Sequence, residues 1–329
     1  MTAVCDPRQP SGTAFALRDP LPWDDVASIV RTAEHEGYAT LFLPEISGRD
    51  AFATLGALAG ETSRLLLGTG VVPMASRTTM MTAMAAATVH ERSQGRLILG
   101  IGTGAVAVGA LERLRGVIRD LRALLDGETV EIDGERLRLT LTPGSRVPIW
   151  IAALGPKAMR LAGEVADGVI LNWCPPERVA FAAERIHEGA DAVGRSPEGV
   201  TISVYVRSWV GEGEADAWPA LAEAAAQYAS YPAYARQFEQ VGLGAEAVNA
   251  VRARREGRLE DVPEALVRAV CAIGDEARAR LEAYREAGAR VPIVYPVASS
   301  DGTASIGSTL STLAPARGGP AGCTAGLEP

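Results

Sequence analysis

The stretch VPIWIAALGPKAMRLAGEVADGVILNW, residues 147–173, decides the fold class of this chain. It opens with the apolar run VPIWIAA and closes with GVILNW, and both have the unbroken hydrophobic character of strands that are buried on two faces. Between them Gly155 and Pro156 precede a helical segment, and proline suits the first position of a helix. A strand, a helix and a second buried strand in this order are typical of a parallel sheet covered by helices.

Apolar runs of this kind recur along the chain. Counting the two above there are eight, at residues 15–17, 41–43, 65–72, 96–102, 147–153, 168–173, 200–206 and 291–297. The segments between them have helical period; Val26, Ile29 and Val30, for example, lie on one face of a helix. Eight alternating units predict a (β/α)8 TIM barrel, in which the reacting groups sit where the strands end. A doubly wound open sheet is the structural alternative.

Two connections are longer than a single helix requires. Residues 126–147, after the fourth strand, contain TVEIDGERLRLT, which predicts a small hairpin that turns at Asp133 and Gly134. Residues 207–290, after the seventh strand, are long enough for several helices. The barrel is therefore expected to carry insertions after strands 4 and 7.

We expect one domain over residues 1–314. The chain beyond residue 299 is rich in Ser, Thr, Gly, Ala and Pro, and it predicts a short helix near 306–313. Residues 315–329 are expected to be a disordered C-terminal tail, because they offer too few apolar side chains to pack.

Composition narrows the classes of function. The 329 residues carry a formal net charge of -8 and a pI near 5.1, so no basic face for nucleic acid or an anionic membrane is expected. No apolar run approaches the roughly 18 residues of a membrane span, and the N-terminal residues lack the apolar stretch of a secretory signal. These features favour a cytoplasmic protein.

Cysteines and histidines predict neither disulfides nor a metal site. Cys5, Cys174, Cys271 and Cys323 lie far apart in the sequence and are expected to be free thiols. No histidine has a cysteine or a second histidine at ligand spacing. Cys174 ends the sixth strand at the reacting face of the barrel, but a buried thiol is the more ordinary interpretation.

The loop that follows the fifth strand predicts an anion site. Gly155 allows a ligand to approach the backbone, and the N–H groups of Leu154, Gly155 and Lys157 can point at an anion at the start of the helix. Lys157, the only lysine in the chain, adds a positive charge. The alternative is an ordinary turn with a surface lysine.

Two glycine-rich segments suggest close approach to a ligand. In RLILGIGTGAV, residues 96–106, Gly100, Gly102 and Ala105 fit a weak dinucleotide pattern, and a glycine-lined floor under a planar ring explains them equally well. In LLLGTGVVPMASRTT, residues 65–79, glycines inside a strand favour a bulge that supports a flat heterocycle. A bend at a barrel corner is the alternative.

Several polar residues follow the predicted strands. Glu45 comes after the second strand in LFLPEISGRDAF and is a candidate acid or base, or an anchor for a ring. Asp50, with Arg49 beside it, is better explained as a helix cap. Candidates for substrate binding are Arg77, Asn172 and Trp173.

The insertion after the seventh strand carries an aromatic cluster. Its members are Tyr228, Tyr231, Tyr234 and Phe238. In a chain that is only 5% aromatic, this clustering predicts either a lid over the substrate or packing against the barrel rim.

Taken together, these segments resemble the bacterial-luciferase-like family, and within it the coenzyme F420-dependent oxidoreductases. The resemblance runs from about residue 15 to residue 313. It rests on LFLPEISGRDAF, GTGVVPMASR, SQGRLILGIGTG and PIWIAALGPKAMRLAGEVADGVILNW, which come in the family's order. The resemblance implies a barrel whose mouth binds a reduced flavin or deazaflavin.

The resemblance also implies where the cofactor lies. The family's third strand ends in a bulge with a non-proline cis peptide behind the ring, which maps to Gly70 and Val71. The cofactor phosphate is held by the loops after strands 4 and 5. These loops map to Gly102, Thr103, Gly104, Ala153, Leu154, Gly155, Pro156 and Lys157.

The resemblance implies hydride transfer between coenzyme F420 and a small organic substrate. Thr103 stands where flavin-using luciferases offer an arginine to the phosphate, which favours the deazaflavin. The alternatives are an FMN-dependent two-component monooxygenase and a non-catalytic flavin-binding homologue; a phosphate-sugar barrel enzyme is a more distant one. A homo-oligomer is expected, and a cofactor reductase is a candidate partner.

Overall fold

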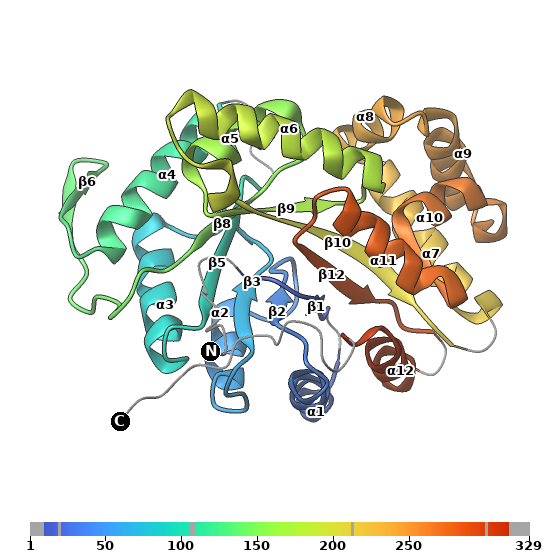
Figure 1. Ribbon diagram of the computed structural model, residues 1–329, viewed down its shortest axis with the longest axis horizontal. Coiled ribbons are helices and arrows are strands. Elements are labelled where there is room, and N and C mark those ends of the chain that lie inside the picture. The colour runs from blue at the N-terminus through green and yellow to red at the C-terminus, as the bar shows by residue number, and fades with distance from the viewer. Residues whose placement is uncertain (1–9, 19–20, 105–108, 212–213, 300–301, 316–329) are drawn as a thin grey trace.

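A closed barrel of parallel strands forms the centre of the molecule (Figure 1). The computed structural model describes residues 10–18, 21–104, 109–211, 214–299 and 302–315. Going around the barrel, the strands are β1 (Ala14–Ala16), β2 (Thr40–Leu43), β3 (Leu66–Thr69), β5 (Leu97–Gly102), β8 (Ile149–Ala152), β9 (Gly168–Asn172), β10 (Thr201–Trp209) and β12 (Val291–Pro296). Because β1 pairs with both β2 and β12, and β9 with β10, the ring has no open edge. The predicted TIM barrel is confirmed, and the open sheet is excluded.

Helices surround the barrel, one after each strand position. They are α1 (Trp23–His35), α2 (Ala51–Leu58), α3 (Thr79–Arg92), α4 (Ala110–Leu125), α5 (Pro156–Val165), α6 (Pro176–Ala192), α11 (Ala277–Glu286) and α12 (Thr303–Leu313). The last helix lies beside the first and agrees with the helix predicted near 306–313 (Figure 1). Residues 316–329 of the predicted tail lie outside the described residues. Within the described ranges, no helix combines the length and the apolar character that a membrane crossing requires.

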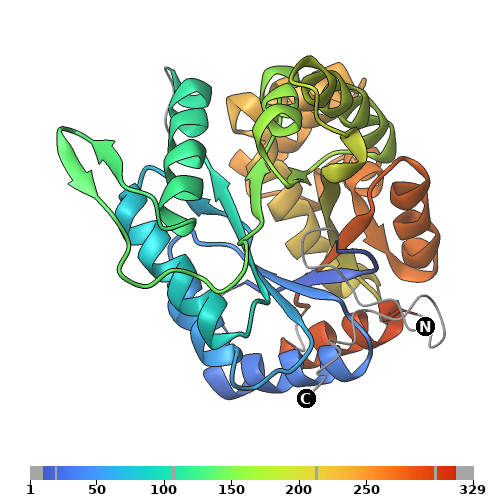
Figure 2. The same ribbon diagram turned by 60° about the vertical axis from the view of Figure 1, so that its left-hand side comes forward.

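Both predicted insertions are present. The first is the hairpin β6 (Val130–Ile132) and β7 (Glu135–Leu137), which turns at Asp133 and Gly134 with positive φ at both residues and projects away from the barrel (Figure 2). Positive φ at two central residues is the geometry of a tight hairpin turn, and it is why the Asp-Gly pair could be identified from sequence.

The second insertion follows β10 and contains a strand that the sequence pattern did not predict. Its elements are α7 (Glu214–Ala229), α8 (Pro232–Gln240), α9 (Gly244–Arg255), η2 (Leu259–Asp261), α10 (Glu264–Val270), β11 (Cys271–Ile273) and η3 (Gly274–Glu276). The short strand β11 pairs in parallel with the end of β10, Arg207–Trp209, beyond the point where β9 stops. It therefore extends the barrel wall on the side where the strands end.

Alternate residues of the barrel strands fill two separate cores. Phe15 packs outward against the helices, whereas Ala14 and Ala16 point into the barrel, as the two-residue period of a strand requires. Inside the barrel, Phe42 and Trp150 lie with ring centroids 5.4 Å apart. These buried side chains fill the interior of the barrel, so the space for a ligand lies at the end of the barrel where the strands finish.

The glycines of β3 and β5 make room for neighbouring parts of the chain. A Cβ on Gly68 would overlap the ring of Phe42, and a Cβ on Gly100 would overlap the carbonyl oxygen of Thr69. The Thr69 hydroxyl donates to the Gly100 oxygen at 2.7 Å and accepts from the Gly100 N–H at 2.8 Å. Internal packing therefore accounts for these two glycines.

Candidate functional site

A cavity of about 370 Å³ opens at the ends of the barrel strands. This volume lies within the usual range of small-molecule sites, and the position is the one at which TIM barrels place their reacting groups. Nine residues predicted for the site line it, namely Glu45, Gly70, Val71, Thr103, Gly104, Ala153, Leu154, Gly155 and Asn172. The other five, Gly102, Pro156, Lys157, Arg77 and Trp173, are not part of the lining.

One wall is the end of the third strand. The peptide bond between Gly70 and Val71 is cis, as the resemblance implied, and the strand resumes as β4 (Val72–Pro73) beside β5. The Tyr205 hydroxyl donates to the Gly70 carbonyl oxygen at 2.6 Å from the opposite side of the barrel. Burial raises the pKa of Tyr205 well above its ordinary value, so this hydroxyl stays a donor.

Gly102 serves the same wall from behind. A Cβ at this position would lie 2.8 Å from the Val71 side chain, so the glycine leaves room for the bulge. The resemblance instead implied a place for Gly102 beside the cofactor phosphate. Thr103 and Gly104, the next two residues, do face the cavity. Ala105, the last residue of the dinucleotide-type pattern, lies outside the described residues.

The start of helix α5 forms a second wall. Pro156 is its first residue, as predicted, and Gly155 is its N-cap with extended φ and ψ of -95° and 162°. Among the described residues, no hydrogen bond uses the N–H groups of Leu154 or Gly155. A Cβ on Gly155 would meet nothing within 4 Å, so the backbone here borders open space. These features make the main chain available to an anion.

The side chains beside this backbone have other positions. Pro156 and Lys157 are exposed and lie off the cavity lining. Buried Arg178 donates to the Leu154 carbonyl oxygen at 3.1 Å and holds the loop from behind. Desolvation lowers the pKa of Arg178, and Cys174 opposes this shift.

Glu45 lies at the cavity edge in a fixed ion pair. Its Oε1 accepts from Nε of Arg77 at 2.9 Å, and its Oε2 accepts from a terminal nitrogen of Arg77, also at 2.9 Å. The Ala51 N–H donates to the same Oε2 at 3.0 Å. Arg77 also pairs with Asp50, and the two carboxylates raise its pKa. The charge of Arg77 is thus already neutralised. Asp50 also caps α2, as predicted, because its side chain accepts a hydrogen bond from the Ala53 N–H.

A third wall of the cavity comes from β9, β10 and the second insertion. Asn172 donates through Nδ2 to the Tyr234 hydroxyl at 2.8 Å, and Gln237 of α8 donates to the carbonyl oxygens of Asn172 and Trp173 at 3.0 and 2.6 Å. Tyr228 and Tyr234 line the cavity. Two of the four predicted aromatic residues of the insertion therefore form part of the cavity wall.

Arg207 is a cavity residue that sequence reasoning missed. It follows the predicted seventh strand directly, and β10 continues through it, so that it faces the barrel interior like Tyr205 two residues earlier. The side chain is 7% exposed. Alternation along a correctly extended strand was the signal that could have identified it.

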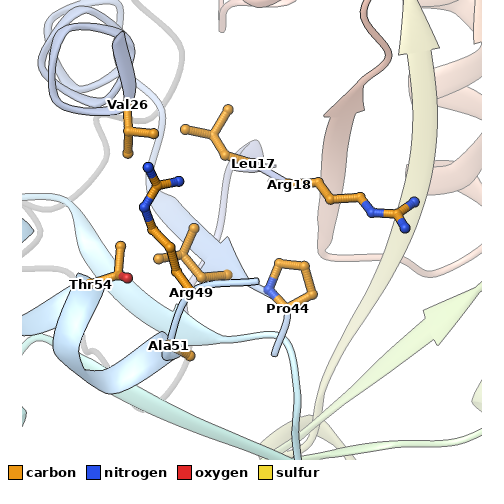
Figure 3. A pocket seen from close by; sticks show the side chains of 8 residues that line it. Leu17, Arg18, Val26, Pro44, Arg49, Ala51 and Thr54 are labelled. Atoms are coloured by element: carbon orange, nitrogen blue, oxygen red, sulfur yellow. The ribbon is translucent and has the colours of Figure 1, made fainter. Parts of the chain in front are cut away.

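A second pocket, of about 30 Å³, lies next to the main cavity. Leu17, Val26 and Arg49 converge on it, and Pro44 lines both spaces (Figure 3). The Arg49 guanidinium donates to the Leu21 carbonyl oxygen at 2.6 Å. A space of this size has room for about one or two water molecules, so it is too small for a cofactor.

Comparison with known proteins identifies the family. The luciferase-like monooxygenase family matches residues 4–290. The chain is 33% identical over 209 residues to the 5,10-methylenetetrahydromethanopterin reductase of Methanolobus tindarius, covering 59% of this chain and 63% of that protein. It is 32% identical over 238 residues to the protein of the same name from Archaeoglobus fulgidus, covering 68% and 71%. The chain therefore belongs to the luciferase-like monooxygenase family.

A solved structure supports the same fold. The coenzyme F420-dependent tetrahydromethanopterin reductase of Methanopyrus kandleri superposes with a TM-score of 0.78 at 22% identity, covering 92% of this chain and 98% of that one. The family predicted from the four sequence segments is confirmed, and the chain is a luciferase-like enzyme. The match covers 63% of the Methanolobus protein, which is less than two thirds of its length.

Proposed function

We propose that this protein is an F420-dependent oxidoreductase that transfers a hydride between the deazaflavin and a small organic substrate. The single observation that carries the proposal is the cavity itself, which has the cis peptide Gly70–Val71 on one side and the open start of α5 on the other. The names of the relatives from Methanolobus and Archaeoglobus, both reductases, support the same class of reaction.

The residues present fit such a cofactor. The N–H groups of Leu154 and Gly155 have no partner among the described residues, and the space in front of Gly155 is open, as a phosphate site requires. Thr103 and Gly104 border the same cavity. We propose that these four residues hold the phosphate and that the Gly70–Val71 bulge supports the ring. When bound, the deazaflavin supplies or accepts the hydride.

The protein's own side chains orient the reactants and exclude water. Tyr205, Tyr228, Tyr234 and Tyr295 place aromatic rings around the part of the cavity next to β10. Such a wall keeps bulk water away from the reacting region, which suits hydride transfer. Glu45 remains the candidate for ring anchoring or proton transfer, and its two-point pairing with Arg77 favours anchoring.

The second candidate function is an FMN-dependent two-component monooxygenase. The description of the matched family favours it, since that description is luciferase-like monooxygenase. The same cavity walls would serve a flavin. A reductase that delivers reduced FMN would then be a required partner.

Titration of the purified protein with coenzyme F420 and with FMN, followed by fluorescence, tests the proposal. We expect micromolar or tighter binding of F420 and weaker binding of FMN. Preference for FMN, with oxygen uptake when reduced FMN is added, would support the monooxygenase. Binding of neither cofactor would overturn both functions, and tight binding without turnover on a broad substrate panel would favour a non-catalytic homologue. The cytoplasmic location, the homo-oligomer and the reductase partner stay predictions.

A further inference from the structure

Arg207 is a buried cation surrounded by aromatic rings. Its guanidinium carbon lies 4.3 Å from the ring centroid of Tyr295 and 4.4 Å from that of Trp173. The rings of Tyr228 and Tyr205 follow at 5.4 and 5.6 Å. The side chain is 7% exposed, and what it exposes faces the cavity.

No carboxylate in the described part of the chain pairs with this guanidinium. Its one hydrogen-bond partner there is the side-chain oxygen of Asn172, which is neutral. Arg77 at the other edge of the cavity differs, because Glu45 and Asp50 both neutralise it. Among the residues that the structure describes, the charge of Arg207 is therefore compensated by dipoles and ring faces alone.

A cation in this position favours an anionic ligand. Burying an ionised group without a counter-ion is unfavourable, and arginine cannot escape the penalty by losing its proton. On the wall of a cavity, a ligand can supply the missing charge. The cavity in front of Arg207 is large enough for that ligand.

The charge balance of the lining defines the anion. Arg207 and Glu45 are the charged residues among those that line the cavity in the described structure, and Glu45 is already paired. One guanidinium balances one negative charge and matches the two oxygens of a carboxylate in a bidentate pair. A phosphate monoester would leave excess negative charge beside apolar rings.

We propose that Arg207 binds the carboxylate of a monocarboxylate substrate whose apolar body packs against the surrounding tyrosine rings. The proposal rests on the proposed function, in which this cavity holds the substrate beside the cofactor. Arg207 stands on β10, whereas the proposed phosphate site uses the loops after β5 and β8. The substrate carboxylate and the cofactor phosphate thus have separate partners.

Calorimetric titration of the full-length protein without cofactor tests this. The probes are benzoate, its neutral analogue benzamide, and phenylphosphate. We expect the wild type to bind benzoate at least tenfold more tightly than benzamide or phenylphosphate. Equal affinity for benzoate and benzamide, or preference for phenylphosphate, would overturn the proposal. Because F420 and FMN are absent, the result does not depend on which cofactor binds.

Variants locate the interaction. Arg207→Gln should reduce benzoate affinity at least tenfold and leave benzamide affinity unchanged. Arg236→Gln removes the same charge from the exposed face of α8, outside the lining, and should bind benzoate like the wild type. Arg207→Lys keeps the charge but loses the two-point geometry, so it should bind benzoate more weakly than the wild type and more tightly than Arg207→Gln. If the glutamine variant does not fold, wild-type benzoate affinity in Arg207→Lys would overturn the assignment. Benzoate affinity unaffected by either Arg207 substitution would overturn the assignment.

A last measurement separates substrate from cofactor. If Arg207 serves the substrate, benzoate and F420 should bind together, and Arg207→Gln should leave F420 affinity within twofold. If benzoate and F420 displaced each other, and Arg207→Gln lost as much F420 affinity as benzoate affinity, the guanidinium would be assigned to the cofactor and the proposal would be overturned.

Discussion

Tyr205 and Gly70, 135 residues apart in sequence, meet inside the barrel, where the tyrosine hydroxyl donates to the glycine carbonyl oxygen at 2.6 Å. The contact joins the seventh strand position to the bulge of the third. It leaves no room for a side chain at residue 70, because a Cβ there would overlap the Tyr205 hydroxyl. The presence of glycine at this position is therefore a packing requirement as well as a feature of the cavity wall.

Gly70→Ala should reduce the free energy of unfolding by about 1–3 kcal/mol, the usual effect of overpacking. Tyr205→Phe should also destabilise the protein, since a buried carbonyl loses its donor. The double variant should be more stable than Gly70→Ala alone, because removing the hydroxyl makes space for the methyl group. Urea denaturation measures all three.

Gly116→Ala in α4 is the matched control, because a Cβ there meets nothing within 4 Å. It should be neutral or slightly stabilising, as alanine favours helix. If the losses of the two single variants simply added in the double variant, the steric relationship would be refuted.

The ion pair of Glu45 with Arg77 makes a second prediction. The two side chains are 16% and 17% exposed, so their interaction is little screened by water. Glu45→Gln and Arg77→Met should each cost about 1–3 kcal/mol of stability, the range for losing charged hydrogen bonds. Their effects should be strongly non-additive, because each variant removes the same pair. A double-mutant cycle by chemical denaturation measures the coupling.

The exposed pair Arg31 and Glu61 provides the comparison. Its members are 53% and 41% exposed, and its coupling should stay below about 1 kcal/mol. Purely additive effects at Glu45 and Arg77 would contradict the anchoring role and favour a free carboxylate at the cavity edge.

Gly155→Val tests the main-chain anion site. Its φ and ψ are extended and suit any residue, and within the described structure no atom beyond the adjacent residues lies within 4 Å of the new Cβ, so folding should be unaffected. The added methyl groups would occupy the space in front of the α5 N-terminus. We expect F420 affinity to fall at least tenfold, measured by fluorescence titration.

Two controls accompany this variant. Gly144→Val adds the same side chain at an exposed loop position with open space and should bind F420 like the wild type. Lys157→Ala should weaken binding less than Gly155→Val, because its side chain lies off the lining. A larger loss for Lys157→Ala would show that the lysine, not the main chain, carries the site.

The buried cysteines should be chemically inert in the folded protein. Burial raises the pKa of Cys174 and of Cys271 to about 12, so at pH 8 almost no thiolate is present at either residue. Alkylation with iodoacetamide, read by peptide mass spectrometry, should leave both unmodified until the protein is denatured. Rapid labelling of native Cys174 would contradict the interpretation of an ordinary buried thiol.

Backbone features of the fold and of the site could be predicted from the sequence. Strands buried on both faces leave unbroken apolar runs, and Pro156 after Gly155 fixed the start of α5 at the predicted residue. The Asp133–Gly134 turn followed from the φ values that only a few residue types adopt readily. Such features depend on neighbours in the chain, which is why the pattern of residues predicts them.

The partners of the site's side chains depend on the register of the barrel strands, so they could not be predicted from the sequence. Glu45 and Arg77 are 32 residues apart, and nothing local shows that they pair. Arg207 was missed because the predicted strand stopped at residue 206, whereas β10 continues to Trp209. The end of β10 is paired by β11, whose three residues are too short to stand out between helices.

The second insertion packs around a hydrophobic core distinct from those of the barrel. Leu221, Phe238 and Val267 belong to this core, which meets the barrel through Trp173 and Trp209. Two of its tyrosines, Tyr228 and Tyr234, reach the cavity. Exchange of this one segment during evolution can therefore change one half of the cavity wall. Activity on a different substrate can arise in this way while the other half of the wall stays the same.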